Sequence, residues 1–251
     1  MHEAFFFGSI ERQLFASYHP PANAGGQTLT ILCAPIFAEY NRTHAIFRKL
    51  SVSLASHGHH VIRFDYSGTG DSFGSLESST VNDWTNDIQR VIQEGIDLTG
   101  CSRVRLLGVR IGALLACTSV NKVKEVDRLV LWDPVCDGSE YFRSLQMRLE
   151  STLSHNQFVS RGDRLKAKRN YSGYNLSEKM VDGIRSMDTS AYTGISSDKL
   201  RVVRTVSSRE FPLRDVLEEV IPANCQWDSE DEEVIMSQPI LESLASRLVE
   251  A

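Results

Sequence analysis

The sequence lacks the long apolar runs, paired cysteines and basic surplus that define several classes of protein. No apolar run in the 251 residues approaches the ~20 needed to cross a bilayer, so no membrane span is expected. The five cysteines are scattered and form no C-x-x-C pair, which argues against a disulfide framework or zinc site and favours a reducing, cytoplasmic location. With 27 Lys and Arg against 32 Asp and Glu, the net charge of −5 gives no reason to expect nucleic acid or an anionic membrane as a partner.

Other familiar signatures are missing too. The opening run Phe5-Phe6-Phe7 has neither the basic leader nor the long apolar region of a signal peptide, so none is predicted. Gly68-x-Gly70 lacks the third glycine of a dinucleotide fingerprint, and no nucleotide, flavin or metal cofactor is expected. The hydrophobic fraction of 41 % and the length suit one large α/β domain or two small ones.

Short apolar runs alternate with helical patterns along most of the chain. Strands are predicted at residues 28–33, 60–64, 104–107 and 129–132, and helices at 45–56, 81–98 and 113–120. Strands alternating with helices of this length imply a mostly parallel sheet covered on both faces. We therefore predict a single α/β domain over residues 1–251 with a doubly wound sheet.

Residues 139–198 interrupt this alternation, because they are polar and carry only weak helical patterns. Ligand sites in such sheets open at the carboxyl ends of the strands, so we predict that this insertion forms a cap, or lid, over those ends. The sheet is predicted to resume at residues 200–206. A helix around 211–220, a strand near 224–227 and a final helix near 232–249 are expected to complete it.

Two glycine-containing motifs follow predicted strands. Residues 63–72 read RFDYSGTGDS, and residues 106–113 read LLGVRIGA, a strand, a sharp turn and a helix of small residues. In this order they resemble the α/β-hydrolase fold, in which G-x-S-x-G presents a nucleophilic serine on a strained turn. Gly108 and Gly112 hold both glycine positions, where a side chain would clash with a neighbouring strand or helix, but the central residue is Arg110.

A further segment narrows the resemblance. Residues 34–42, APIFAEYNR, resemble the Pro-Phe-Ala-Glu-Glu-x-Asn segment of the exosortase-A-system-associated hydrolases, close to the serine aminopeptidase S33 branch. The type-2 proteins of that subgroup also place arginine in the elbow, and residues 131–135 with Gly138 are similar to their next strand end. The resemblance implies a bacterial protein of a biosynthetic or export pathway, nominally acting on an ester, acyl or amide compound.

The sequence does not supply a serine-hydrolase triad at the expected positions. The fold places its histidine after the last strand, here roughly residues 226–235, yet the last histidine of the chain is His155. Arginine stays protonated and is a very poor nucleophile. We therefore predict that the ordinary triad is lost, which leaves open whether the protein is an enzyme.

Arg110 can act in two ways. A guanidinium at the elbow could bind a carboxylate or phosphate, so we predict a pocket for a small anionic or acyl ligand. The residues predicted to line it are Arg110, Val109, Ile111, Phe37 and Asp133. Alternatively, Arg110 pairs internally with an acid such as Asp133 or Asp65, and a ligand could compete for the same arginine.

Weaker candidates would support other functions. A relocated triad would need Ser67 or Cys33 within ~3 Å of His44 or His155. For Cys33 the alternative is plain packing in the core, and for Ser67 it is a backbone role in its glycine turn. For each histidine the alternative is a capping or surface position. A non-catalytic scaffold that binds another protein of its pathway is the second hypothesis for the whole chain.

Overall fold

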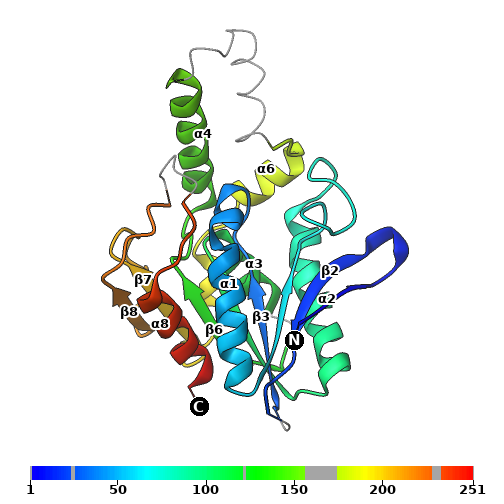
Figure 1. The fold of residues 1–251 in the computed structure, drawn as a ribbon. Coiled ribbons are helices and arrows are strands. Elements are labelled where there is room, and N and C mark those ends of the chain that lie inside the picture. Colours follow the sequence, from blue (N-terminus) through cyan, green and yellow to red (C-terminus); the bar gives the residue numbers. More distant parts are fainter. Residues whose placement is uncertain (1, 24–25, 121–122, 156–173, 228–232, 251) are drawn as a thin grey trace.

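The computed structural model describes residues 2–23, 26–120, 123–155, 174–227 and 233–250 (Figure 1). These residues form a sheet of eight strands in the order β1-β2-β4-β3-β5-β6-β7-β8. The strands are β1 (Glu3–Phe7), β2 (Leu14–His19), β3 (Thr28–Cys33), β4 (His59–Phe64), β5 (Arg103–Val109), β6 (Val126–Trp132), β7 (Leu200–Thr205) and β8 (Leu217–Ile221). β2 is antiparallel to β1 and β4, and the pairs from β4 to β8 are parallel.

Helices cover both faces of the sheet, which confirms the predicted doubly wound fold. They are α1 (Ala38–Ser56), α2 (Val81–Thr99), α3 (Ile111–Val120), α4 (Gly138–His155), α6 (Glu178–Arg185), α7 (Ser190–Thr193) and α8 (Gln238–Val249), with a short 3₁₀ turn, η1 (Ile10–Arg12). One buried core lies between the sheet and α2 and α3, and a second lies between the sheet and α1 and α8. In the part of the chain that the structure describes, no helix is long and apolar enough to span a bilayer.

Most predicted elements up to β7 are confirmed, with different ends. β3 and the start of α2 lie where the sequence placed them, whereas α1 begins at Ala38 instead of residue 45. The predicted helix at 211–220 is wrong, because residues 217–221 pair with β7 as the edge strand β8. Leu and Glu favour helices intrinsically, but the hydrogen bonds to β7 decide the conformation. The predicted strand at 224–227 is also wrong, since these residues are irregular.

The predicted cap falls only partly within the described residues. Residues 156–173 lie outside them, and the flanking parts contain α4, α6 and α7. In Figure 1, α4 and α6 extend beyond the carboxyl ends of the parallel strands. Tyr192 of α7 donates a hydrogen bond to the carbonyl of Val135, which follows β6. These helices therefore lie at the edge of the sheet where a ligand site is expected.

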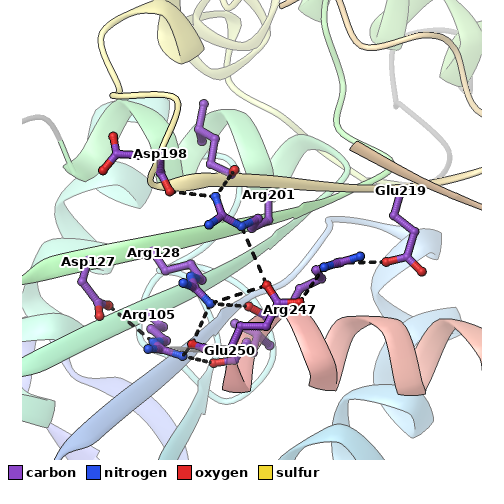
Figure 2. Close-up of polar contacts among 10 residues, drawn as sticks. Arg105, Asp127, Arg128, Asp198, Arg201, Glu219, Arg247 and Glu250 are labelled. Carbon is purple, nitrogen blue, oxygen red and sulfur yellow. Dashed lines mark hydrogen bonds and ion pairs between the residues drawn. The ribbon is translucent and has the colours of Figure 1, made fainter. Parts of the chain in front are cut away.

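Arginines from three neighbouring strands hold the C-terminal end of α8 (Figure 2). Arg105 of β5 donates to the main-chain carbonyls of Leu248 and Glu250, and Arg128 of β6 donates to the carbonyl of Glu250 at 2.7 Å. Arg201 of β7 lies 3.9 Å from the Glu250 carboxylate. The last carbonyls of a helix have no partner within the helix, so these cations satisfy them and fix α8 to the sheet.

The turn between β5 and α3 requires both of its glycines. A Cβ atom on Gly108 would lie 2.5 Å from the Cα atom of Ala113. On Gly112 it would lie 2.5 Å from the carbonyl oxygens of Cys33 and Ala34, at the end of β3. Real Cβ atoms do not approach backbone this closely, so the predicted clash with a neighbouring strand and helix is confirmed.

Candidate active site

Arg110 lies at the tip of a central strand, between β5 and α3. Its φ angle of 53° is in the left-handed region, which non-glycine residues rarely adopt and which marks a strained position. The turn is held by main-chain hydrogen bonds: the Arg110 N–H donates to Trp132, and its carbonyl accepts from Ala113 and Val135. The strand, turn and helix thus have the arrangement of a nucleophile elbow, with arginine at its centre.

The Arg110 guanidinium is held by α1 and by the end of β6. Its Nε donates to Oε1 of Glu39 at 3.1 Å, and its Nη1 donates to the main-chain carbonyl of Asp133 at 3.2 Å. Glu39 is 1 % exposed and also accepts a hydrogen bond of 3.1 Å from the Tyr141 hydroxyl. One of the two predicted alternatives was an internal ion pair with an acid such as Asp133 or Asp65, and the structure contains an internal ion pair. The residue prediction is wrong, because the carboxylate that pairs with Arg110 is that of Glu39.

The electrostatic surroundings keep this arginine charged. Burial by itself lowers the pKa of Arg110, but the carboxylate of Glu39, with help from Tyr141 and Asp133, outweighs it and raises the pKa above its ordinary value. Burial, followed by the Glu39 charge, also raises the pKa of Tyr141, so its hydroxyl remains a hydrogen-bond donor. The group therefore consists of a cation and a carboxylate bridged by hydrogen bonds.

Trp227 and Asp133 continue the group on the other side of Arg110. The Trp227 indole N–H donates to Oδ2 of Asp133 at 2.7 Å, and the guanidinium carbon of Arg110 lies 5.1 Å from the Trp227 ring centroid. Asp133 is 0 % exposed and also accepts from the main-chain N–H and the hydroxyl of Thr205. Arg110, Trp227 and Asp133 therefore form a continuous chain, joined by a cation–π contact and a hydrogen bond.

Arg110, Asp133 and Trp227 follow one another along the sequence in the order of a catalytic triad. In the fold's usual order, the nucleophile at the elbow is followed in sequence by the acid and then by the histidine, whose N–H the acid accepts. Trp227 falls within residues 226–235, where the histidine was expected, and its N–H makes the corresponding bond to Asp133. An indole is only a donor, and a guanidinium cannot attack. Arg110 and Trp227 are therefore hydrogen-bond donors in this site, and the buried carboxylate of Asp133 is an acceptor.

A cavity of about 570 Å³ opens beside Arg110. The Arg110 side chain keeps 14 % of its surface exposed, and none of the described residues accepts a hydrogen bond from its Nη2. It is surrounded by apolar walls, hydroxyl groups and a charged rim, formed by Pro134, Val135, Tyr141, Trp227, Ser144, Thr189, Ser207, Ser208, Asp137, Glu140, Arg209 and Glu210. This combination of apolar walls with a few convergent donors is typical of a small-molecule site.

Five residues were predicted to bind a ligand, and of these Arg110 lines this cavity. The side chains of Val109 and Ile111 are fully buried in the two cores, and Asp133 lies beneath Trp227. Phe37 is 7 % exposed and packs in the core, at a strained φ of 58°. Ligand contact by these four side chains stays a prediction.

The candidates for a relocated triad lie in different places. Cys33 is fully buried, and burial raises the pKa of its thiol. The main-chain N–H of Ser67 donates to the buried carboxylate of Asp87, and Ser67 lines a separate cavity, whereas His44 is exposed on α1. The described contacts bring no histidine to Cys33 or Ser67, and the side chain of His155 lies outside the described residues. Among the described residues, no group of three or more His, Cys, Asp or Glu could hold a metal ion.

Three residues of the site were not predicted: Glu39, Tyr141 and Trp227. Glu39 stands in the 34–42 segment that carried the family resemblance, so a signal for it was present. Trp227 lies within residues 226–235, where a triad would have its histidine, and the sequence did not indicate a role for its indole. Nothing in the sequence around Tyr141 indicated its contact with Glu39.

The strand order and the elbow define an α/β-hydrolase fold. A model of the family described as "Serine aminopeptidase, S33" matches residues 31–182, more than half of the chain, and the chain belongs to this family. It is 31 % identical over 141 residues to the palmitoyl-protein thioesterase ABHD10, mitochondrial, of Homo sapiens, and 32 % identical to that of Pongo abelii. Each match covers 46 % of this chain and 45 % of the relative, so the chain spans less than half the length of these proteins.

Solved structures agree in fold. The thioesterase domain from the curacin biosynthetic pathway superposes with a TM-score of 0.62 and 15 % identity, covering 100 % of both chains. Est1E from Butyrivibrio proteoclasticus, solved with ferulic acid bound, has a TM-score of 0.60 and 14 % identity, covering 87 % of this chain and 88 % of the other. At these identities the likeness shows the shared fold.

Proposed function

We propose that this chain is a member of the S33 family that binds an anionic or acyl small molecule beside Arg110 and does not hydrolyse it. The observation that carries the proposal is the chain of Arg110, Trp227 and Asp133 at the positions of a triad. Neither arginine nor tryptophan can attack a carbonyl or accept a proton at neutral pH. The position that normally performs chemistry instead presents a fixed cation to the cavity.

Several features support an acyl or anionic ligand. Nη2 of Arg110 has no partner among the described residues and can donate to a carbonyl or carboxylate oxygen. The cavity of about 570 Å³ lies within the range of small-molecule sites, and Pro134, Val135 and Trp227 give it apolar walls. The related ABHD10 is named a palmitoyl-protein thioesterase, and this name favours an acyl ligand over an anionic one.

Residues 139–198 are proposed to act as a cap on this site. In the described part, Tyr141 of α4 contacts Glu39, and Arg148 of α4 donates to the carbonyl of Trp227 at 2.6 Å. The resemblance of residues 34–42 to exosortase-associated hydrolases supports a place in a bacterial biosynthetic or export pathway. The five free cysteines favour the cytoplasm.

The loss of the nucleophile is tested with a fluorophosphonate probe followed by mass spectrometry of the peptides. Arginine occupies the elbow, and the Ser56 hydroxyl, which lies 3.5 Å from His57 Nδ1, donates to the Ser53 carbonyl at an exposed position on α1. We therefore expect no adduct on any serine. Hydrolysis of p-nitrophenyl esters should stay at the level of buffer alone. A single labelled serine contradicts the proposal, and an active serine hydrolase treated in parallel is the positive control.

The binding half of the proposal is tested with Arg110→Ala. Titration calorimetry with octanamide and octanoate should detect binding of at least one of them to the wild type and neither to the variant. If Arg110→Ala leaves binding unchanged, Arg110 is not the ligand's partner. If the wild type binds neither compound but purifies with a stoichiometric protein partner, the scaffold hypothesis is favoured instead.

A further inference from the structure

The positive charge of Arg110 is already balanced inside the protein. Its Nε lies 3.1 Å from Oε1 of Glu39, which is almost fully buried and carries a second hydrogen bond from Tyr141. Glu39 also belongs to the first turn of α1, where the helix dipole favours a negative charge. The carboxylate is therefore fixed beside the guanidinium and stays there when a ligand enters.

The rest of the cavity adds no unbalanced positive charge. Its described lining carries the two arginines Arg110 and Arg209 against the three carboxylates of Asp137, Glu140 and Glu210. Arg209 is itself paired with Glu140. A negatively charged ligand would therefore meet an excess of carboxylates. Glu39 would add to the repulsion, because it contacts the same arginine that would bind the ligand.

We infer that Glu39 is a specificity-determining residue that makes this cavity select an uncharged acyl compound, such as an amide or ester, over a free carboxylate. The inference rests on the proposed function and decides between its two ligand classes. A neutral carbonyl oxygen accepts a hydrogen bond from Nη2 of Arg110 without adding charge. A carboxylate at the same place would repel Glu39, because two carboxylates that share a site are not readily ionised together.

The test compares two ligands that differ only in charge. Octanamide and octanoate have the same chain length, and octanoate is ionised at neutral pH. We expect the wild type to bind octanamide about a hundredfold more tightly than octanoate, because a carboxyl group must then be protonated well above its ordinary pKa, and Glu39→Gln to reverse that preference. Glutamine keeps the size of the side chain and an oxygen for Arg110, while its NH₂ can donate to the Tyr141 oxygen.

Asp87→Asn is the matched control. Asp87 is also a buried carboxylate, but it is held by Ser67 and Arg90 and lines a different cavity. Its replacement should leave the preference for octanamide as in the wild type. Circular dichroism of each variant shows whether it is folded before its binding is measured.

A second measurement needs no variant. The charged and titratable groups of this cluster are Arg110, Tyr141 and Asp133, with Arg42 on the same helix as Glu39 and Arg148 of α4 close to Tyr141 and Arg42. If octanoate enters this site, we expect it to take up about one proton, seen by calorimetry in two buffers of different ionisation enthalpy. Octanamide should take up none.

The outcomes separate the inference from the proposed function. If the wild type binds neither compound, the proposed function fails. If it prefers octanoate, binds octanoate without taking up a proton, or keeps its preference in a folded Glu39→Gln variant, the inference is overturned. In these three cases binding that Arg110→Ala abolishes would still support the proposed function.

Discussion

Trp227 keeps the hydrogen bond of a triad histidine while lacking the basic nitrogen that catalysis needs. Its N–H reaches Asp133 at 2.7 Å, and its ring lies against the Arg110 guanidinium. An imidazole in the same position could donate to Asp133 through one nitrogen and present the other toward the elbow. The missing chemistry is thus confined to two side chains, and the supporting carboxylate is in place.

The double variant Arg110→Ser with Trp227→His should therefore gain esterase activity. We expect hydrolysis of p-nitrophenyl acetate to rise about 10²-fold above the wild type, because a serine would then have a base that Asp133 orients. Release of p-nitrophenolate measures the rate, and the introduced serine should react with fluorophosphonate.

The single variants are the controls for this gain. Arg110→Ser lacks a base and Trp227→His lacks a nucleophile, so each should stay at the wild-type level, since triad members act as a unit. Adding Asp133→Asn to the double variant should remove most of the gained activity. If Arg110→Ser alone is as active as the double variant, a base outside this chain of residues must serve the elbow.

The residues of the site differ in how far the sequence could predict them. Arg110 was predicted because the two glycines that set its turn are local to it. Glu39 is 71 residues away from Arg110 and reaches it only because β3 and β5 are neighbours in the sheet. Trp227 is 94 residues from Asp133 and follows an edge strand that was itself predicted as a helix. Such pairings depend on sheet order, which local patterns do not contain.

At the scale of elements, the elbow depends on how closely α3 approaches the end of β3. There is no room for a Cβ atom at Gly112, because it would lie 2.5 Å from two backbone carbonyl oxygens at the end of β3. Backbone cannot rotate away as a flexible side chain can, so a larger residue must displace the helix. The same packing places Arg110 above the sheet.

Gly112→Ala should lower the free energy of unfolding by about 2–4 kcal/mol, because α3 must move away from β3. Urea denaturation followed by circular dichroism measures the change. Gly100→Ala is the control: its φ is +68°, but a Cβ there meets nothing within 4 Å, so only about 1 kcal/mol should be lost. Equal losses in both variants would contradict the proposed close contact.

Elements with strong periodicity were predicted well, and β7 and most of α8 were also predicted, whereas residues 211–227 were not. α2 begins at Val81 as predicted, where Thr80 and Asp83 form a capping box that a local pattern can reveal. β8 begins with the helix-favouring residues Leu-Glu-Glu, exposes most of its side chains as an edge strand, and is defined by its pairing with β7. Its conformation is therefore a property of the sheet and not of its own residues.

On the scale of the whole molecule, one end of the sheet carries the candidate ligand site and the other end stabilises the fold. The carboxyl ends of the strands carry Arg110 and the cavity, at the edge where open α/β sheets bind ligands. The amino ends carry Arg105 and Arg128, which fix the last turn of α8 (Figure 2), and the buried His59 at the start of β4. Changes at the amino ends should therefore affect stability and leave ligand binding unchanged.

Two buried histidines make this stability depend on pH. Burial, followed by the nearby charge of Arg105, lowers the pKa of His59 to about 4, and burial with Arg63 lowers that of His19 to about 4. An unfolded histidine titrates near 6.5, so between about pH 6.5 and about pH 4 the unfolded chain binds more protons than the folded one. The free energy of unfolding should therefore be fully retained above this window and fall through it as the pH is lowered.

Urea denaturation at a series of pH values measures this loss, and His59→Gln should reduce its slope, because one of the histidines whose pKa is lowered, which include His60, no longer titrates. Asp87 acts in the opposite direction, since burial raises its pKa and acid then favours its folded form, so the observed loss is a difference between the two effects. An unfolding free energy that stays constant from about pH 6.5 to about pH 4, or a slope unchanged in His59→Gln, would show that His59 takes up its proton as readily in the folded protein as in the unfolded chain.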